Sequence, residues 1–166
     1  MQIATLSDNF TRPDDTTAYA ANDLVANNTT AGSVIPLSWP RVNVGKNGQI
    51  AIHWVRLSKS GASATNAEFR VHFSTASPTV ANGDNGAFSS SQAASYIGSA
   101  DVTMLPFTDG CAGLTALGTN SPVAAVDFPA AENTIYALVE ALAAYTPAAE
   151  EVFTATIFVE RLSERG

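Results

Sequence analysis

Alternation of apolar and polar positions predicts a long strand near the end of the chain. Over residues 152–160, Phe153, Ile157 and Val159 form an apolar row, and the positions between them are largely polar. Successive side chains of a strand point to opposite faces, so this row is expected to face a core. Residues 135–142 are apolar on most of both faces, which is typical of a strand in the middle of a covered sheet.

A turn is expected between these two strands at Thr146-Pro147, because proline fixes φ and lacks a backbone donor. A helix over residues 137–149 is the competing interpretation, since this stretch is rich in alanine. The β-branched residues on either side, such as Val139 and Val152, disfavour a helix. The pattern therefore predicts a β-hairpin that closes the chain.

Further strands follow from the same period of two. Residues 67–74 alternate most clearly, with Phe69, Val71 and Phe73 on the inward face. Shorter or less regular apolar stretches predict strands at residues 1–10, 23–26, 34–37, 96–105 and 122–128.

The strand expected at residues 49–58 has Ile50, Ile52 and Trp54 on one face, and Trp54 is expected to pack in the core. Asn47-Gly48 precedes it, and this pair is preferred in the type I′ turn of a hairpin because both central residues need a positive φ. Polar, glycine-rich stretches at residues 78–95 and 108–121 are expected to be mostly loops.

About eight strands and no convincing helix predict an all-β protein, an antiparallel β-sandwich in which a jelly roll is favoured over a simple meander. The length of 166 residues suits a single domain. Turn formers dominate residues 11–39. We therefore expect a sandwich over residues 40–166 and an extended N-terminal arm over residues 1–39, packed on the domain or projecting from it.

Charge is unusually scarce. Charged residues make up 14% of the chain and apolar residues 46%, whereas about 25% charged is ordinary. This shortage suggests that other subunits cover part of the surface. The net charge of −7 argues against a nucleic-acid partner. The sequence contains no run of 18 apolar residues, so we expect no membrane-spanning helix.

The basic residues gather between Arg41 and Arg70, where five of the eight lie, whereas residues 71–159 contain no Lys or Arg. Two differently solvated faces would explain this distribution. A second interpretation is complementary steering, in which the basic segment of one subunit meets an acidic surface of its neighbour.

Candidate chemistry is sparse. Cys111 lies in a glycine loop far in sequence from His53 and His72, so a small buried thiol is favoured over a nucleophile and a zinc site is not expected. His53 is interpreted as a packed histidine and His72 as a surface or interface residue. The loop at residues 82–86 has oxygen ligands and glycines but lacks the spacing of a calcium loop, so a plain turn is favoured. We expect no enzyme activity and no cofactor.

Two stretches resemble a known family. Residues 11–26, TRPDDTTAYAANDLVA, are similar to the TRPxDTTAYAxGDxxA opening of a family of small virion proteins of tailed bacteriophages. Residues 135–156 are similar to the closing pattern of that family through IYALVE, AYTPA and VFTAT. Asn22 stands where the family usually has glycine. Together the two stretches cover about a quarter of the chain, in the right order.

The resemblance implies a capsid decoration (cement) protein of jelly-roll type on the outer surface of the virion. Its partners would be the major capsid protein and itself, as a homotrimer. A receptor-binding or carbohydrate-binding module of a phage fibre or tail is the alternative, with Trp39 and Phe88 as candidate aromatic contacts. The candidate capsid or subunit interface residues are Arg12, Asp14, Tyr19, Leu24, Val25, Trp39, Arg41, Arg56 and Arg70.

Overall fold

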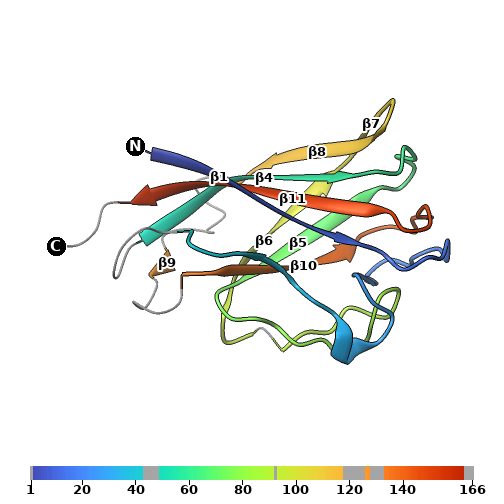
Figure 1. The fold of residues 1–166 in the computed structure, drawn as a ribbon, viewed down its shortest axis with the longest axis horizontal. Coiled ribbons are helices and arrows are strands. Elements are labelled where there is room, and N and C mark those ends of the chain that lie inside the picture. The colour runs from blue at the N-terminus through green and yellow to red at the C-terminus, as the bar shows by residue number, and fades with distance from the viewer. Residues whose placement is uncertain (1, 43–48, 92, 118–125, 128–132, 163–166) are drawn as a thin grey trace.

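The computed structural model describes residues 2–42, 49–91, 93–117, 126–127 and 133–162. Two antiparallel sheets face each other, and a single short 3-10 helix, η1 (Ala31–Ser33), occurs among the described residues (Figure 1). The all-β antiparallel sandwich predicted from the sequence is confirmed. The first sheet has the order β1 (Gln2–Thr11), β11 (Val152–Leu162), β4 (Gln49–Lys59), β8 (Gly110–Ala116) and β7 (Leu105–Phe107), and β9 (Val126–Asp127) also pairs with β4.

The second sheet is built on β10 (Ile135–Ala141), which pairs with β5 (Glu68–Ser74) along one edge. Along its other edge β10 pairs with both β2 (Leu24–Val25) and β3 (Leu37–Trp39), so these two short strands continue one another. β6 (Tyr96–Thr103) completes the sheet beside β5. The prediction that residues 135–142 form a central strand is confirmed, and the helical alternative is excluded. The predicted closing β-hairpin is wrong, because β10 lies in the second sheet and β11 in the first, so the turn between them crosses from one sheet to the other.

The strand order is that of a jelly roll. When β2 and β3 are counted as one strand and the short β7 and β9 are left aside, eight strands remain. The first pairs with the last (β1–β11), the second with the seventh, the third with the sixth (β4–β8) and the fourth with the fifth (β5–β6). This nested pairing over two sheets defines the double Greek key, so the jelly-roll prediction is also confirmed.

The core lies between the sheets and is filled by the rows that the alternation predicted. Phe153, Ile157 and Val159 of β11 are fully buried, and so are the inward residues of β5, Phe69, Val71 and Phe73. Phe69 and Phe153 meet edge to face across the sandwich, with ring centroids 5.3 Å apart. Burying a side chain of this size contributes roughly 1.5–3 kcal/mol, so these rows supply much of the stability of the fold.

The alternation in β4 changes phase in the middle of the strand. Ile50 and Ile52 are buried, but further along the strand the buried residues are Val55 and Leu57. Phe158 of β11 lies opposite Trp54 and Val159 lies opposite Ile52, so His53 is an extra residue, a β-bulge that turns the following side chains over. Trp54 consequently faces outward and is 38% exposed. Its predicted place in the core is wrong.

The segment of residues 1–39 is an integral part of the sandwich. β1 pairs with β11 over ten residues without a register shift, and β2 and β3 complete the second sheet. Tyr19 and Trp39 belong to the core. The segment therefore packs on the domain, and its separation as an extended arm distinct from residues 40–166 is not supported by the pairing of its strands.

Residues 110–116, expected as loop, form the inner strand β8. Its glycines interrupt the alternation of apolar and polar residues that predicts a strand. They allow the backbones of the two sheets to approach closely at this edge. A Cβ on Gly113 would lie 2.4 Å from the carbonyl oxygen of Thr103 in β6, so only glycine fits there. Thr115 Oγ1 also donates to the carbonyl of Asp101 at 2.6 Å. β7 contains Pro106, which an edge strand tolerates.

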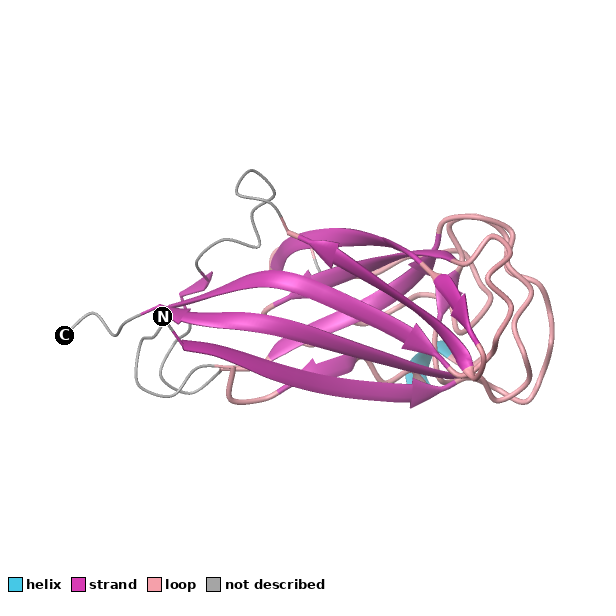
Figure 2. Ribbon diagram, turned by 90° about the horizontal axis from the view of Figure 1, so that it is seen from above, coloured by secondary structure: helices cyan, strands magenta, loops and turns pink. Residues whose placement is uncertain are grey.

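Two predictions fall on residues that are not described. The Asn47-Gly48 turn lies outside the described residues, and so does most of the strand expected at residues 122–128, of which only β9 is described. The connections β1–β2, β4–β5, β7–β8 and β10–β11 lie at one end of the sandwich (Figure 1), where Figure 2 shows loops, in pink, gathered together.

Ile157→Asp tests the register of β11. Ile157 is fully buried in the core, so the substitution places an unpaired carboxylate there. We expect a loss of several kcal/mol and no cooperative unfolding transition by circular dichroism. Thr154→Asp is the matched control because Thr154 lies on the opposite face of the same strand and is partly exposed. A folded Ile157→Asp variant as stable as the control would refute the register.

Candidate functional site

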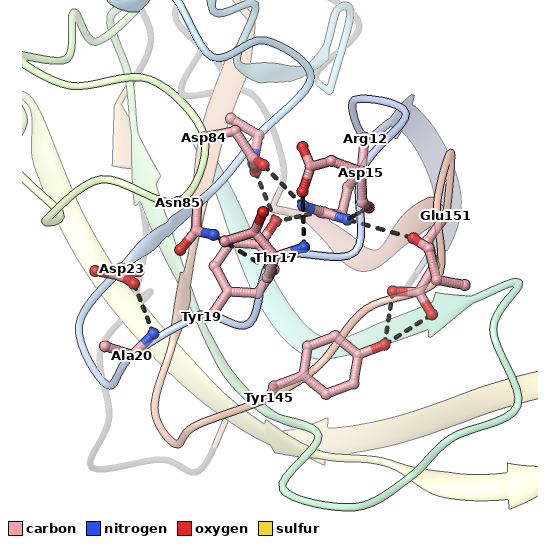
Figure 3. A network of polar contacts seen from close by, with 12 residues as sticks. Arg12, Asp15, Thr17, Tyr19, Ala20, Asp23, Asp84, Asn85, Tyr145 and Glu151 are labelled. Atoms are coloured by element: carbon pink, nitrogen blue, oxygen red, sulfur yellow. Dashed lines mark hydrogen bonds and ion pairs between the residues drawn. The ribbon is translucent and has the colours of Figure 1, made fainter.

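The opening motif folds around Arg12, which follows β1 directly and has a fully buried side chain (Figure 3). Its Nε donates to Tyr19 Oη, and a terminal nitrogen lies 2.9 Å from Asp84 Oδ2. The other terminal nitrogen donates to the carbonyls of Asp15 and Ala148, at 3.4 and 3.3 Å. Nearly all the donors of the guanidinium are used, as a buried arginine requires.

Asp84 is the buried anion that balances Arg12. Tyr19 Oη donates to Asp84 Oδ1 at 2.6 Å, and the backbone nitrogen of Ala26 donates to the same oxygen at 2.7 Å. The loop carrying Asp84 packs tightly, since a Cβ on Gly83 would lie 2.0 Å from the carbonyl oxygen of Thr29. The loop at residues 82–86 thus brings a carboxylate to the motif.

A second buried ion pair lies beside the first. Lys59 Nζ is 3.0 Å from Glu151 Oε1, and both side chains are fully buried. Tyr145 Oη donates to both carboxylate oxygens of Glu151, at 2.6 and 2.7 Å, and Lys59 also donates to the carbonyl of Gly61 at 2.7 Å. Each half of the network therefore consists of a cation, a tyrosine and a carboxylate.

The two halves are joined through their tyrosines. The rings of Tyr19 and Tyr145 stack with centroids 6.3 Å apart and an interplanar angle of 10°. Arg12 lies 4.8 Å from the centroid of Tyr19, and Lys59 lies 4.9 Å from that of Tyr145, which adds a cation–π contact to each half. We call these residues, together with Asp84 and Glu151, the buried polar network.

Burial and neighbouring groups shift the pKa values of Arg12, Asp84 and both tyrosines. Burial raises the pKa of Asp84, and the hydrogen bonds from Tyr19 and Ala26 and the charge of Arg12 only partly offset this. Burial alone would lower the pKa of Arg12, but the charge of Asp84 and the hydrogen bonds to Tyr19 and Asp84 raise it above its ordinary value. Burial, together with the Asp84 charge, raises the pKa of Tyr19 far above its ordinary value. Burial and Glu151 do the same for Tyr145. Both phenols therefore remain neutral donors near pH 7, and neither is suited to act as a general base.

The network holds a surface loop in one conformation. Backbone hydrogen bonds connect Arg12 N to the Glu151 carbonyl (3.0 Å) and Tyr19 N to the Tyr145 carbonyl (2.8 Å). The backbone nitrogen of Glu150 donates to the Pro13 carbonyl at 3.2 Å, which places two loops side by side. Their exposed residues, which we call the motif surface, are Asp14, Thr16, Thr17, Ala18, Ala148, Ala149 and Glu150.

Asn22 adopts a φ of 70°, the left-handed conformation that glycine adopts freely and asparagine tolerates. Asparagine in place of the glycine of the resembled motif is therefore compatible with the same turn. The Ala20 nitrogen donates to Asp23 Oδ2 at 2.6 Å and closes this turn (Figure 3).

The predicted interface residues divide into two groups. Asp14, Arg41 and Arg56 are exposed, and Arg70 is partly exposed and paired with Asp101 at 2.6 Å. The other five are buried within the subunit and are not accessible to a partner in this structure: Arg12, Tyr19, Leu24, Val25 and Trp39. The sequence analysis assigned Arg12 and Tyr19 to an interface, but both side chains lie inside the subunit.

Part of the basic segment is neutralised within its own subunit. Lys59 pairs with Glu151, and Arg70 forms two hydrogen bonds to Asp101, at 2.6 and 2.9 Å. Arg56 lies 5.9 Å from the ring centroid of Phe158. Fewer unpaired cations are therefore available for an electrostatic contact with a neighbouring subunit than the sequence suggested.

Both histidines are bonded to glutamates. His72 Nε2 lies 2.7 Å from Glu140, and its ring stacks on Phe88 with centroids 4.5 Å apart. His53 Nε2 lies 2.7 Å from Glu160, so this histidine has a hydrogen-bond partner, but its side chain is 36% exposed and it does not pack in the core.

Cys111 is buried, as expected. In the part of the chain that the structure describes, no group of three or more His, Cys, Asp and Glu residues could hold a metal ion. Among the same residues, no helix has the length and apolar character needed to span a membrane.

No protein-family model matches the chain, and no curated protein matches it. Among solved structures, the chain is similar to the decameric BFDV capsid protein, at 10% identity and a TM-score of 0.39 over 98% of this chain and 99% of that chain. It is also similar to a chain of the full Israeli acute paralysis virus particle heated to 63 degrees, at 11% identity and a TM-score of 0.34 over 97% of this chain and 73% of that one. TM-scores below 0.5 do not establish a common fold, so the jelly-roll assignment rests on the strand order.

Arg12→Met tests the buried ion pair. Asp84 would keep its burial and lose its cation, so we expect a loss of about 3–5 kcal/mol in the free energy of unfolding. Adding Asp84→Asn removes the uncompensated charge, so the double variant is expected to lose less than the sum of the two single variants. Arg70→Met is the matched control, because its ion pair is exposed and should contribute about 0–1 kcal/mol. Equal losses for Arg12→Met and Arg70→Met in urea denaturation would contradict this role.

His72 predicts a pH dependence of stability. Burial lowers the pKa of His72, and the hydrogen bond and charge of Glu140 only partly offset it. Just below the ordinary value of about 6.5, the unfolded chain therefore binds more protons at this site than the folded one, and stability falls as the pH falls. Between about pH 7 and 5, wild type should lose stability more steeply than His72→Gln, measured by denaturant unfolding at each pH. Parallel curves for the two proteins would rule out His72 as the source.

Proposed function

We propose that this protein is a structural component of a virus particle and, more specifically, a decoration (cement) protein that binds the outer surface of a tailed-phage capsid. The observation that carries the proposal is the buried polar network. The residues that make up the resembled opening motif, Arg12 and Tyr19 above all, hold a surface loop in a fixed conformation at one end of a jelly roll. Because folding already orders this loop, a partner that docks there does not incur the entropic cost of ordering it on binding.

The motif surface is the part of the chain that we assign to the capsid. It carries the exposed Asp14 and Glu150 on two adjacent loops, which the hydrogen bond from the Glu150 nitrogen to the Pro13 carbonyl joins, and the network packs beneath these loops. An acidic surface fits a basic patch on the major capsid protein. Binding to the assembled shell, and not to the free capsid subunit, would stabilise the closed shell by mass action.

The net charge supports the outer position. A chain with a net charge of −7 would be repelled by packaged DNA, whereas the outside of the shell imposes no such cost. The protein acts as a binding component without catalysis or cofactor, and a homotrimer is the assembly we propose for it. The two aromatic residues suggested for the fibre-module alternative are not exposed platforms, since Trp39 is 1% exposed and Phe88 is partly buried and stacked on His72.

Co-sedimentation with capsids that lack this protein tests the proposal. We expect saturable binding by wild type and a loss of affinity of at least about tenfold, or 1.4 kcal/mol, for the double variant Asp14→Lys/Glu150→Lys. Both residues are exposed, so the thermal unfolding of the variant should be unchanged. Glu68→Lys is the control, because it changes an exposed acid on β5, outside the motif surface.

Two outcomes would count against the proposal. Failure of the wild-type protein to bind capsids, with recovery in tail or fibre fractions, would exclude decoration. Equal binding by Asp14→Lys/Glu150→Lys and Glu68→Lys would leave decoration standing but exclude the motif surface as the contact.

A further inference from the structure

β1 leaves one side of the first sheet open. It is the last strand in the sheet order and pairs only with β11, so its other side has no partner strand among the described residues. The pairing runs over ten residues without a register shift, and the only charged residue of β1 is Asp8. Edge strands are commonly short, bulged or protected by proline and lysine, because an unprotected edge accepts a further strand.

The other sheet edges have such protection. β7, at the far end of the same sheet, has three residues and contains Pro106. β6 has an extra residue at Ile97, where its register with β5 shifts, and its Asp101 carbonyl accepts a hydrogen bond from Thr115 of β8. β2 and β3, at the remaining edge, have two and three residues. In the part of the chain that the structure describes, β1 is therefore the one long edge without protection.

The register fixes which backbone groups of β1 point to the open side. The nitrogen of Arg12 donates to the carbonyl of Glu151, which lies opposite it just beyond the paired strands, at 3.0 Å. Hydrogen-bonded pairs recur at every second residue of an antiparallel ladder, so Phe10 also bonds to β11. The N–H and C=O groups of Asn9 and Thr11 therefore point away from β11. Among the described residues, none of these four groups has a hydrogen-bond partner.

A groove of about 510 Å³ lies along these unpaired groups, and we call it the β1 groove. Its lining is mixed, with three apolar residues, Phe10, Ile35 and Pro36, and five polar ones, Asp8, Asn9, Thr11, Asn27 and Ser38. Two hydrogen bonds hold its far wall: Asp8 accepts from the Ser38 nitrogen at 2.7 Å, and Asn27 accepts from the Ile35 nitrogen at 2.8 Å. The volume lies within the range of roughly 300–1,000 Å³ that binding pockets occupy.

We infer that an extended peptide segment of a partner protein binds in the β1 groove as an added strand beside β1. Main-chain hydrogen bonds to Asn9 and Thr11 supply affinity in this mode, and alternate side chains of the segment contact the apolar part of the lining. The mixed lining suits a peptide, because its backbone needs polar partners and only every second side chain faces the groove.

Charge favours a segment that carries a lysine or an arginine. Asp8 is the only charged residue in the lining, and only its Oδ2 has a hydrogen-bond partner among the described residues. The net charge of −7 adds to the attraction for a basic segment. A second copy of this chain would be repelled by the same charge, and its β1 has no basic residue to offer. This inference does not depend on the proposed function.

Selection from a library of short linear peptides of random sequence, with the purified full chain as the target, tests the inference. We expect the enriched peptides to alternate apolar residues with other residues and to include lysine or arginine. Asp8→Asn should bind these peptides severalfold more weakly, because it removes the negative charge and keeps an oxygen that accepts from the Ser38 nitrogen.

Asn9→Pro removes the backbone donor that faces the groove. Bonds between β1 and β11 should persist, since an edge strand tolerates proline where the N–H points outward. The enriched peptides should bind this variant at least about tenfold more weakly, because a peptide carbonyl loses its donor. Asn9→Ala keeps the donor and should bind as wild type does. Thr5→Pro is the matched control, because Thr5 points its N–H to the same open side but lies outside the groove.

A second measurement applies if Asn9→Pro does not fold. In isotope-labelled wild type, peptide binding should shift the amide resonances of Asn9 and Thr11 and slow their hydrogen exchange, whereas the amide of Thr5 should not change.

Three results would each overturn the inference: no peptide that prefers wild type to Asn9→Pro, an equal loss of affinity in Asn9→Ala, or unchanged amides of Asn9 and Thr11 in the complex. Self-association of wild type that Asn9→Pro and Thr5→Pro both abolish would also overturn it, because a second copy would then occupy the edge. The probes are free peptides, so failure of this test leaves the decoration proposal untouched.

Discussion

The ion pair between Arg12 and Asp84 is the interaction on which the end of the sandwich depends. Neither charge is accessible to water, so each is tolerable only while the other is present. The two residues are 72 positions apart, and their contact ties the connection after β1 to the long loop between β5 and β6. Tyr19 and Tyr145 extend this tie to Lys59 and Glu151, and so to the connection by which the chain crosses from β10 in one sheet to β11 in the other. Buried ion pairs and hydrogen bonds thereby hold a surface loop of polar residues in place, as apolar packing holds the core.

Much of the fold could be predicted from the sequence. A period of two in hydrophobicity identifies a strand wherever each residue lies opposite a single residue of the neighbouring strand. The rows on β5 and β11 were found in this way. The prediction failed at two places. The β-bulge at His53 reverses which side chains of β4 face the core. In β8, Gly113 contributes no side chain to the pattern, because the backbone of β6 lies where its Cβ would be. A bulge and a close approach between sheets are properties of pairs of strands, so one strand's own pattern does not contain them.

The candidate site was predicted only in part. The motif drew attention to Arg12 and Tyr19, but polar residues in a turn-rich segment resemble surface residues, and burial depends on Asp84, a residue in a loop that looked like an ordinary turn. The available signal was composition: an arginine in so charge-poor a chain needs a carboxylate partner if it is buried. The exposure of the apolar residues on the β7–β8 hairpin could not be predicted from the sequence, because the packing of the two sheets decides which face of a strand meets water.

The pairing of the first strand with the last has a consequence for synthesis. Gln2 lies opposite Arg161, so β1 has no strand partner until β11 has left the ribosome. At about 5–20 residues per second, its apolar side chains and unpaired backbone wait roughly 10–30 s. Contacts between such distant residues also make folding slow after release. A chain built in this way is exposed to aggregation during expression, and nascent β1 is the segment that a chaperone would have the most reason to protect.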